Sequence, residues 1–191
     1  EAMSSLIKGF EAMVPAILIL TLAWTLKSMT DSLGAAEYVS TVVASSASEL
    51  QMLLPAIIFL VAAFLAFATG TSWGTFGILI PICIAVFPAA DPLRIISISA
   101  CMAGAVCGDH ISPISDTTIM ASAGAECKHV HHVSSQLPYA LTVAAISFLT
   151  FIVAGFTHTL GMVTSAIISW IFGIAMLGFA LFYLNNRSKV K

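Results

Sequence analysis

Charged side chains are scarce in this 191-residue chain. Asp, Glu, Lys and Arg make up 8% of its residues, whereas they make up about 25% of a typical soluble domain. None of them occurs between Glu49 and Asp91 or between Lys128 and Arg187, and apolar runs of about 20 residues are typical of transmembrane helices. The scarcity of charge excludes an ordinary soluble domain. It predicts an all-α integral membrane protein, with residues 1–191 forming a single membrane domain.

Two further absences narrow the class of protein. The four cysteines lie inside or at the ends of apolar segments and form no C-x-x-C motif, which excludes a secreted disulfide framework and favours buried thiols. The chain has no basic patch, so we expect no nucleic-acid partner. Its main partner is expected to be the lipid bilayer, and no cofactor is expected.

The apolar stretch of residues 53–87 is interrupted by the polar segment "TGTSWGT", residues 69–75. Neither arm, 53–68 or 76–87, comfortably spans the membrane core of about 30 Å. Irregular backbone at membrane depth is tolerated only where protein buries it or water lines it. Residues 53–87 are therefore predicted to form a re-entrant hairpin.

A second interruption lies within residues 95–125, where apolar segments flank "GDHISPISDTT", residues 108–118. Pro113 removes a backbone donor and disfavours helical conformation in the residue before it. We predict one broken helix over residues 95–125, interrupted near residues 108–115.

The other apolar segments read as ordinary helices. They cover residues 13–26, about 137–156 and about 162–184, and the polar stretch after residue 26 is expected to contain a short interfacial helix. With a re-entrant hairpin, five Lys and Arg residues fall on one side of the membrane and two on the other. The positive-inside rule then places the C-terminus in the cytoplasm.

Discontinuous helices expose free carbonyl and amide groups, and many secondary transporters build ion and substrate sites from them. Oxygen ligands suit hard cations, and an exchangeable carboxylate could hold either a proton or a metal ion. We therefore expect Asp109 and Asp116 to carry the exchangeable charge. The predicted oxygen ligands are Ser112, Ser115, Thr117, Thr118, Thr69, Thr71, Ser72 and Thr75, with Na+ placed at Asp109, Asp116 and Ser115. The residues predicted to shape the backbone are Gly70, Gly74, Gly108 and Pro113.

Several other interpretations stay open from the residues alone. Asp116 could simply cap a helix, and Asp109 could pair with His110, as in a purely structural membrane subunit. "GTSWG", residues 70–74, matches the G-x-S-x-G nucleophile motif, so an intramembrane serine hydrolase using Ser72 and His110 is a remote alternative. The histidines of "HVHH", residues 129–132, are more typical of a polar interfacial loop than of a metal site.

Three segments resemble the NhaC-type sodium/proton antiporter family. They are "GFEAMVPAILILTLAWTL", "FATGTSWGTFGILIPI" and "GDHISPISDTTIMASAGAECKHVHHVSSQLPYA", and together they cover much of residues 9–140. The last two spans match only in hydropathy. The resemblance implies a bacterial inner-membrane transporter of the ion transporter superfamily, built from two inverted repeats that each contain a hairpin and a broken helix. It also implies Na+ coupling.

Taken together, the residues and the resemblance predict Na+/H+ antiport, with Na+ and H+ as coupling ions. The alternative is a Na+-coupled exchanger or symporter of organic anions, such as malate or lactate, or of amino acids. Family members are about twice as long, so the chain is expected to supply one repeat, the C-terminal half. It would work with the missing N-terminal half or a partner chain, and a homodimer is left open.

Overall fold

The computed structural model describes residues 48–188 continuously. Of the first 47 residues it describes only Met3, 6–11, Val14, 21–22, Thr25, Met29 and 32–33. The predicted apolar segment 13–26 and the interfacial helix after it therefore lie mostly outside the described residues. From residue 48 onward every regular element is a helix. The helices are α3 (Ser48–Thr69), α4 (Ser72–Val86), α5 (Pro92–Ile111), α6 (Asp116–Gly124), α7 (His129–Thr157), the short η1 (His158–Leu160) and α8 (Met162–Ser188).

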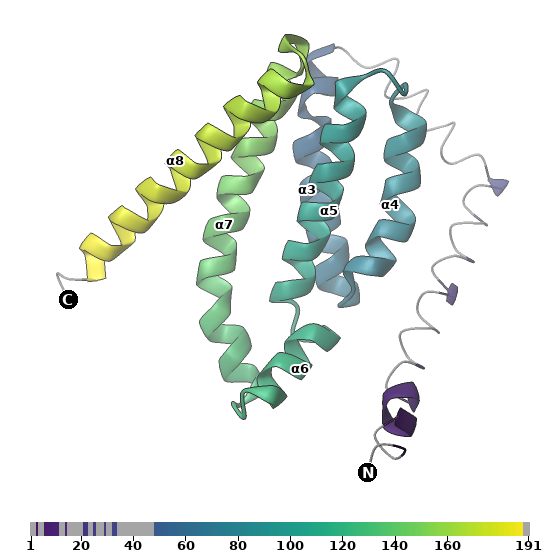
Figure 1. Cartoon of the computed structure of the whole chain (residues 1–191), viewed down its shortest axis with the longest axis vertical. Coiled ribbons are helices and arrows are strands. Elements are labelled where there is room, and N and C mark those ends of the chain that lie inside the picture. The colour runs from purple at the N-terminus through teal and green to yellow at the C-terminus, as the bar shows by residue number, and fades with distance from the viewer. Residues whose placement is uncertain are drawn as a thin grey trace.

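Helices α3 and α4 are antiparallel and are joined only by Gly70 and Thr71 (Figure 1). Gly70 ends α3 because it adopts φ +68°, a conformation that glycine reaches without strain. The Thr71 side chain then accepts a hydrogen bond from Gly74 N at 3.4 Å and caps α4. The polar segment 69–75 is thus confined to the junction of the two helices and the first turn of α4.

The two arms differ in length more than the sequence indicated. Helix α3 begins at Ser48 and has 22 residues, or about 33 Å at 1.5 Å per residue, which is enough to cross a bilayer. Helix α4 has 15 residues, or about 22 Å. The expectation that neither arm is long enough therefore holds only for α4.

The predicted interruption of residues 95–125 is present and is shorter than expected. Asp91 caps α5 by accepting a hydrogen bond from Leu93 N at 2.9 Å, and Pro92 occupies the first turn. The helix continues through Gly108 and ends at Ile111, two residues before Pro113. Helix α6 resumes at Asp116, so the break comprises residues 112–115.

Four of the described helices are long and apolar enough to cross a membrane: Leu50–Thr69, Pro92–Ile111, His129–Leu160 and Met162–Asn186. The shorter apolar helix is Ser72–Val86. Helix α7 packs along α3 and α5, whereas α8 leans away from the bundle after the turn at Gly161 (Figure 1). The chain is a multi-pass membrane protein.

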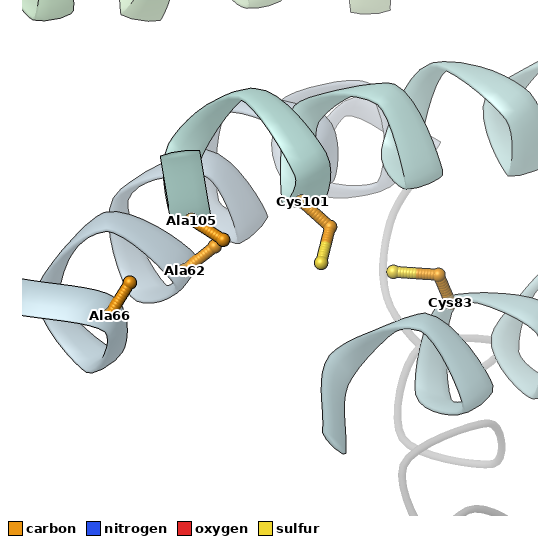
Figure 2. Packing of buried hydrophobic residues seen from close by; sticks show 5 residues of the cluster. All are labelled: Ala62, Ala66, Cys83, Cys101 and Ala105. Carbon is orange, nitrogen blue, oxygen red and sulfur yellow. The ribbon is translucent and has the colours of Figure 1, made fainter. Parts of the chain in front are cut away.

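Small residues allow α3 and α5 to pack very closely. An ideal Cβ built on Gly104 would overlap the carbonyl oxygen of Phe59, and one built on Gly108 would overlap that of Ala63. The neighbouring buried cluster contains Ala62 and Ala66 of α3, Cys101 and Ala105 of α5, and Cys83 of α4. Figure 2 shows Ala62 close to Ala105, with the sulfur atoms of Cys83 and Cys101 pointing toward each other. The contact between α3 and α5 is therefore made by backbone and small side chains, with larger side chains such as Phe76 and Ile98 packed around it.

Candidate functional site

The two chain breaks contact each other, which the sequence alone could not establish. The Ser112 hydroxyl, in the break between α5 and α6, donates a 2.8 Å hydrogen bond to the carbonyl oxygen of Phe67 near the end of α3. An ideal Cβ on Gly70 would lie 2.8 Å from the carbonyl oxygen of Ile114. The junction of α3 and α4 is thus pressed against the break of residues 112–115. We call these two contacting segments the paired breaks.

Asp109 is a buried carboxylate beside the paired breaks. It is 6% exposed, and its Oδ1 atom has no hydrogen-bond partner. It lies one helical turn beyond Ala105 on the face of α5 that packs into the bundle, and its backbone oxygen accepts the amide of Ser112 at 3.1 Å. An unpaired buried carboxylate is unfavourable unless a proton or a cation binds to it. Asp109 is therefore the most conspicuous ion-binding candidate in the described residues.

Asp116 has a different environment. Its side chain is exposed, and its Oδ1 accepts a hydrogen bond from the adjacent Thr117 amide at 2.7 Å. No hydrogen bond joins it to Asp109 among the described contacts. Ser115 is fully buried, and its hydroxyl bonds to that of Thr117 at 2.7 Å. The structure therefore separates the two predicted acids into a buried one and an exposed one at the start of α6.

Hydroxyl groups of the hairpin lie at the same end of the bundle. Ser72 and Thr75 are buried, and Thr75 Oγ1 donates to the carbonyl oxygen of Thr71 at 3.0 Å. Thr69 is exposed, and its hydroxyl donates to Leu65 O of its own helix at 2.8 Å. This hydroxyl is therefore directed at the backbone of α3. Gly74 is also buried in the first turn of α4.

Four helix ends meet at the paired breaks: the C-termini of α3 and α5 and the N-termini of α4 and α6 (Figure 1). C-terminal ends carry partial negative charge and free carbonyl groups, whereas N-terminal ends carry partial positive charge and free amide groups. This arrangement can attract a cation to the ends of α3 and α5. It can also attract an anionic group to the starts of α4 and α6.

Two residues outside the predicted site also hold the break in place. His129, in the first turn of α7, has its Nε2 atom 2.7 Å from the carbonyl oxygen of Pro113. Gln136, two turns further along α7, donates from Nε2 to the carbonyl oxygen of His110 at 2.6 Å. His129 was interpreted as part of a polar interfacial loop. No spacing signal in the sequence connects it or Gln136 to the break.

The hydrolase alternative receives no support from the local geometry. Ser72 follows helix α3 and not a strand, which a nucleophile elbow requires. The His110 side chain is exposed and its Nδ1 atom lies 3.2 Å from Val106 O of its own helix. Among the described residues, no cluster of three or more His, Cys, Asp or Glu side chains could hold a metal ion.

One groove lies apart from the paired breaks. It has a volume of about 510 Å³ between α5, α7 and α8, and apolar side chains form most of its wall. Ser169 lines it with a buried hydroxyl that has no partner. Other hydroxyl side chains also line this groove, but no carboxylate among the described residues does, so it lacks the exchangeable charge expected of the ion site.

Apolar spanning helices with breaks that contact each other, and a buried carboxylate one turn before one of the breaks, are typical of a secondary transporter. A family model described as the Na+/H+ antiporter family matches residues 1–156. The chain belongs to this family, which is a family of transporters and not of enzymes. The match includes nearly all of α7, a span that resembled the family only in hydropathy, and it ends before α8.

Similarity to individual proteins is consistent with that assignment. An uncharacterized protein of Haemophilus influenzae is 48% identical over 160 residues, which are 83% of this chain and 30% of that protein. A malate-2H(+)/Na(+)-lactate antiporter of Bacillus subtilis is 32% identical over 57% of this chain and 24% of its own length. The arginine/ornithine antiporter ArcD of Halobacterium salinarum is 32% identical over 56% of this chain and 23% of its own length.

The chain thus spans less than a third of the length of these curated relatives. No solved structure matches it.

Proposed function

We propose that this chain forms part of a secondary active transporter that exchanges Na+ for H+ across the membrane. The observation that carries the proposal is the buried Asp109 carboxylate, whose Oδ1 atom has no partner and which lies beside the paired breaks. A carboxylate at membrane depth costs about 2.5–3.5 kcal/mol on insertion scales. Either a proton or Na+ would offset that cost, and because both neutralise the same group, binding of one displaces the other.

In this proposal Na+ binds between the Asp109 carboxylate and the hydroxyl oxygens of Ser112 and Ser115, which are both fully buried. Thr71 and Ser72 supply oxygens from the hairpin, and Thr117 lies behind Ser115 as its hydrogen-bond partner. Asp116 is exposed and serves as an outer carboxylate that attracts the cation. We therefore expect Asp109→Asn to impair exchange more severely than Asp116→Asn.

Exchange across the membrane also requires the site to face each side in turn. In transporters with broken helices, one bundle moves against another around a fixed site. We propose that residues 53–87 act as a re-entrant hairpin in this movement, supported by the shortness of α4. A second, inverted repeat would complete the site, either in the missing N-terminal half or in a partner chain. We also propose a homodimer, in which a second copy of this chain is the partner.

A bacterial inner membrane is the proposed location, with a cytoplasmic C-terminus. Helix α7 starts at the end of the bundle that holds the paired breaks, and α8 runs back from the opposite end toward that side (Figure 1). Lys128 precedes the former and Arg187 belongs to the latter. Because positively charged residues favour the cytoplasmic side, the paired breaks would lie toward the cytoplasm.

The second candidate function is Na+-coupled exchange or symport of an organic anion or amino acid. Two observations favour it. The chain is similar to a malate/lactate antiporter and to an arginine/ornithine antiporter, and the N-termini of α4 and α6 lie at the paired breaks. Backbone amides there could bind a carboxylate without an arginine. Under this alternative the Na+ site at Asp109 is unchanged, and the organic solute binds near the N-terminus of α4 in the hairpin.

The deciding experiment uses the complete transporter, this chain together with its second repeat, in proteoliposomes that contain a pH-sensitive dye. A Na+ gradient is applied alone and then with malate, lactate or arginine on one side. Na+-driven proton movement without organic solute, lost in Asp109→Asn, is the result expected for antiport. Movement that requires an organic solute would instead establish the second function.

A matched control is Asp91→Asn, because Asp91 caps α5 at the opposite end of that helix. This variant should retain exchange. If Asp109→Asn and Asp116→Asn both retained full ion coupling, the two acids would have only structural roles and the proposal would be abandoned.

A further inference from the structure

The break after α5 releases backbone carbonyl groups that need new partners. The last carbonyls of any helix lack partners within that helix, and buried ones are unfavourable unless they are paired. At the end of α5 these groups include the carbonyl oxygen of His110, and within the break they include that of Pro113. These groups need hydrogen-bond donors from elsewhere in the protein.

Side chains from other helices satisfy both carbonyls. The His110 oxygen accepts hydrogen bonds from Gln136 Nε2 at 2.6 Å and from Thr118 Oγ1 at 3.2 Å. The Pro113 oxygen lies 2.7 Å from His129 Nε2. A carbonyl oxygen can only accept, so the proton in this bond is on Nε2 of His129.

His129 also connects α6 to this arrangement. Its Nδ1 atom lies 3.2 Å from the Ser122 hydroxyl, which in turn donates to Ile119 O at 2.8 Å. The single imidazole ring thus bridges the break, α6 and the first turn of α7. At its other end α7 is pressed against α3, where a Cβ on Gly155 would overlap the carbonyl oxygen of Met52. Helix α7 is therefore packed against the helix that leads into the other break.

We propose that His129 and Gln136 are positioning residues for the ion site. They do not touch the ion. They fix the carbonyls of Pro113 and His110 relative to α7, and so hold Ser112 and Ser115 in reach of the Asp109 carboxylate. This inference rests on the proposed function, because it concerns the same Na+ site.

The test is the Na+ concentration for half-maximal exchange in proteoliposomes made with the complete transporter, this chain together with its second repeat. Gln136→Glu keeps the shape of the side chain and replaces the amide donor with a carboxylate that faces the His110 carbonyl. His129→Ala removes the ring. Each should raise the half-maximal Na+ concentration about two- to tenfold, the net effect of losing one intramolecular hydrogen bond, with a smaller change in maximal rate.

Rescue and control variants separate positioning from general stability. His129→Gln retains an N–H donor and should recover most of the Na+ affinity. His131→Ala and Ser135→Ala lie on the same helix and should behave as the native protein, because His131 is exposed and Ser135 bonds only within its own turn. If Gln136→Glu fails to accumulate in the membrane, Gln136→Asn replaces it, since it keeps the amide on a shorter side chain.

The inference is wrong if the half-maximal Na+ concentration stays at the native value in the Gln136 and His129 variants. It is also wrong if they lower only the maximal rate in proportion to folded protein. In both cases the proposed function would still stand, provided that the native protein exchanges Na+ for H+ and that Asp109→Asn abolishes this exchange. If the native protein itself moves no protons in response to Na+, the proposed function fails first.

Discussion

The close contact of α3 with α5 yields a sharp test of the fold. An ideal Cβ on Gly108 would overlap the Ala63 carbonyl oxygen and lie 2.8 Å from its carbon and 2.9 Å from Phe67 N. These are backbone atoms, so no side chain can rotate away to make room. The favourable separation of non-bonded heavy atoms is about 3.5–4.0 Å, so Gly108→Ala must push the two helices apart by at least about 1 Å.

The size of the effect follows from two opposing contributions. Overpacking a tight core costs about 1–3 kcal/mol, and contact with backbone atoms places this site in the upper half of that range. Replacing glycine by alanine within a helix contributes about 1 kcal/mol in the opposite direction. Gly108→Ala should therefore lower the free energy of unfolding by about 1–2 kcal/mol.

Gly77 provides the matched control, because a Cβ there meets nothing within 4 Å. Gly77→Ala should be neutral or stabilising by up to about 1 kcal/mol. The assay is reversible unfolding of the purified protein in mixed micelles with increasing denaturing detergent, followed by tryptophan fluorescence. Equal stability of the two variants would refute the close contact of α3 and α5.

The same contact predicts non-additive behaviour. Gly104 meets Phe59 one turn away from Gly108 along the same pair of helices. Once one alanine has separated the helices, the second has less to displace, so the double variant should lose less stability than the two single losses combined. Full additivity would indicate that the two contacts are independent and that the helices do not move as rigid bodies.

Two further predictions concern the break and the thiols. Ser112→Ala removes the hydrogen bond to Phe67 O that links the paired breaks. It should lower the free energy of unfolding by about 1–3 kcal/mol. A loss below about 0.5 kcal/mol in the same micelle assay, which is the size of a neutral surface substitution, would contradict this prediction. Maleimide should label the exposed Cys127 quickly in folded protein and the buried Cys83 and Cys101 only after unfolding. Mass spectrometry of the labelled peptides checks this order, and equal labelling of Cys83 and Cys127 would contradict the buried cluster.

Much of the architecture could be predicted from local patterns. The long uncharged stretches identify spanning helices because a bilayer excludes charge. Pro113 locates the end of α5, since helices usually end at or before the residue that precedes a proline. The exact limits of the break were harder to predict. Gly108 lies inside α5, where the absence of a side chain allows α3 to pack closely against it.

The environments of the two acids could not be predicted. Asp109 and Asp116 stand in the same polar segment, and both are natural candidates for an ion site. Only the direction of each side chain relative to α3 and α7 makes one buried and the other exposed. The contacts of His129 and Gln136 with the break were equally hidden, because they join residues 16 and 26 positions apart without a repeating pattern.

The sequence by itself determined that this protein lies in a membrane, that its backbone is helical and that two apolar stretches are broken. These properties follow from hydropathy and from the covalent limits of proline and glycine, which act within a few residues. The tertiary structure alone decided that the two breaks meet, that Asp109 faces the bundle and that α7 holds the break in place. Those outcomes depend on how closely α3 and α5 can approach, and the packing of helices distant in the chain sets that distance.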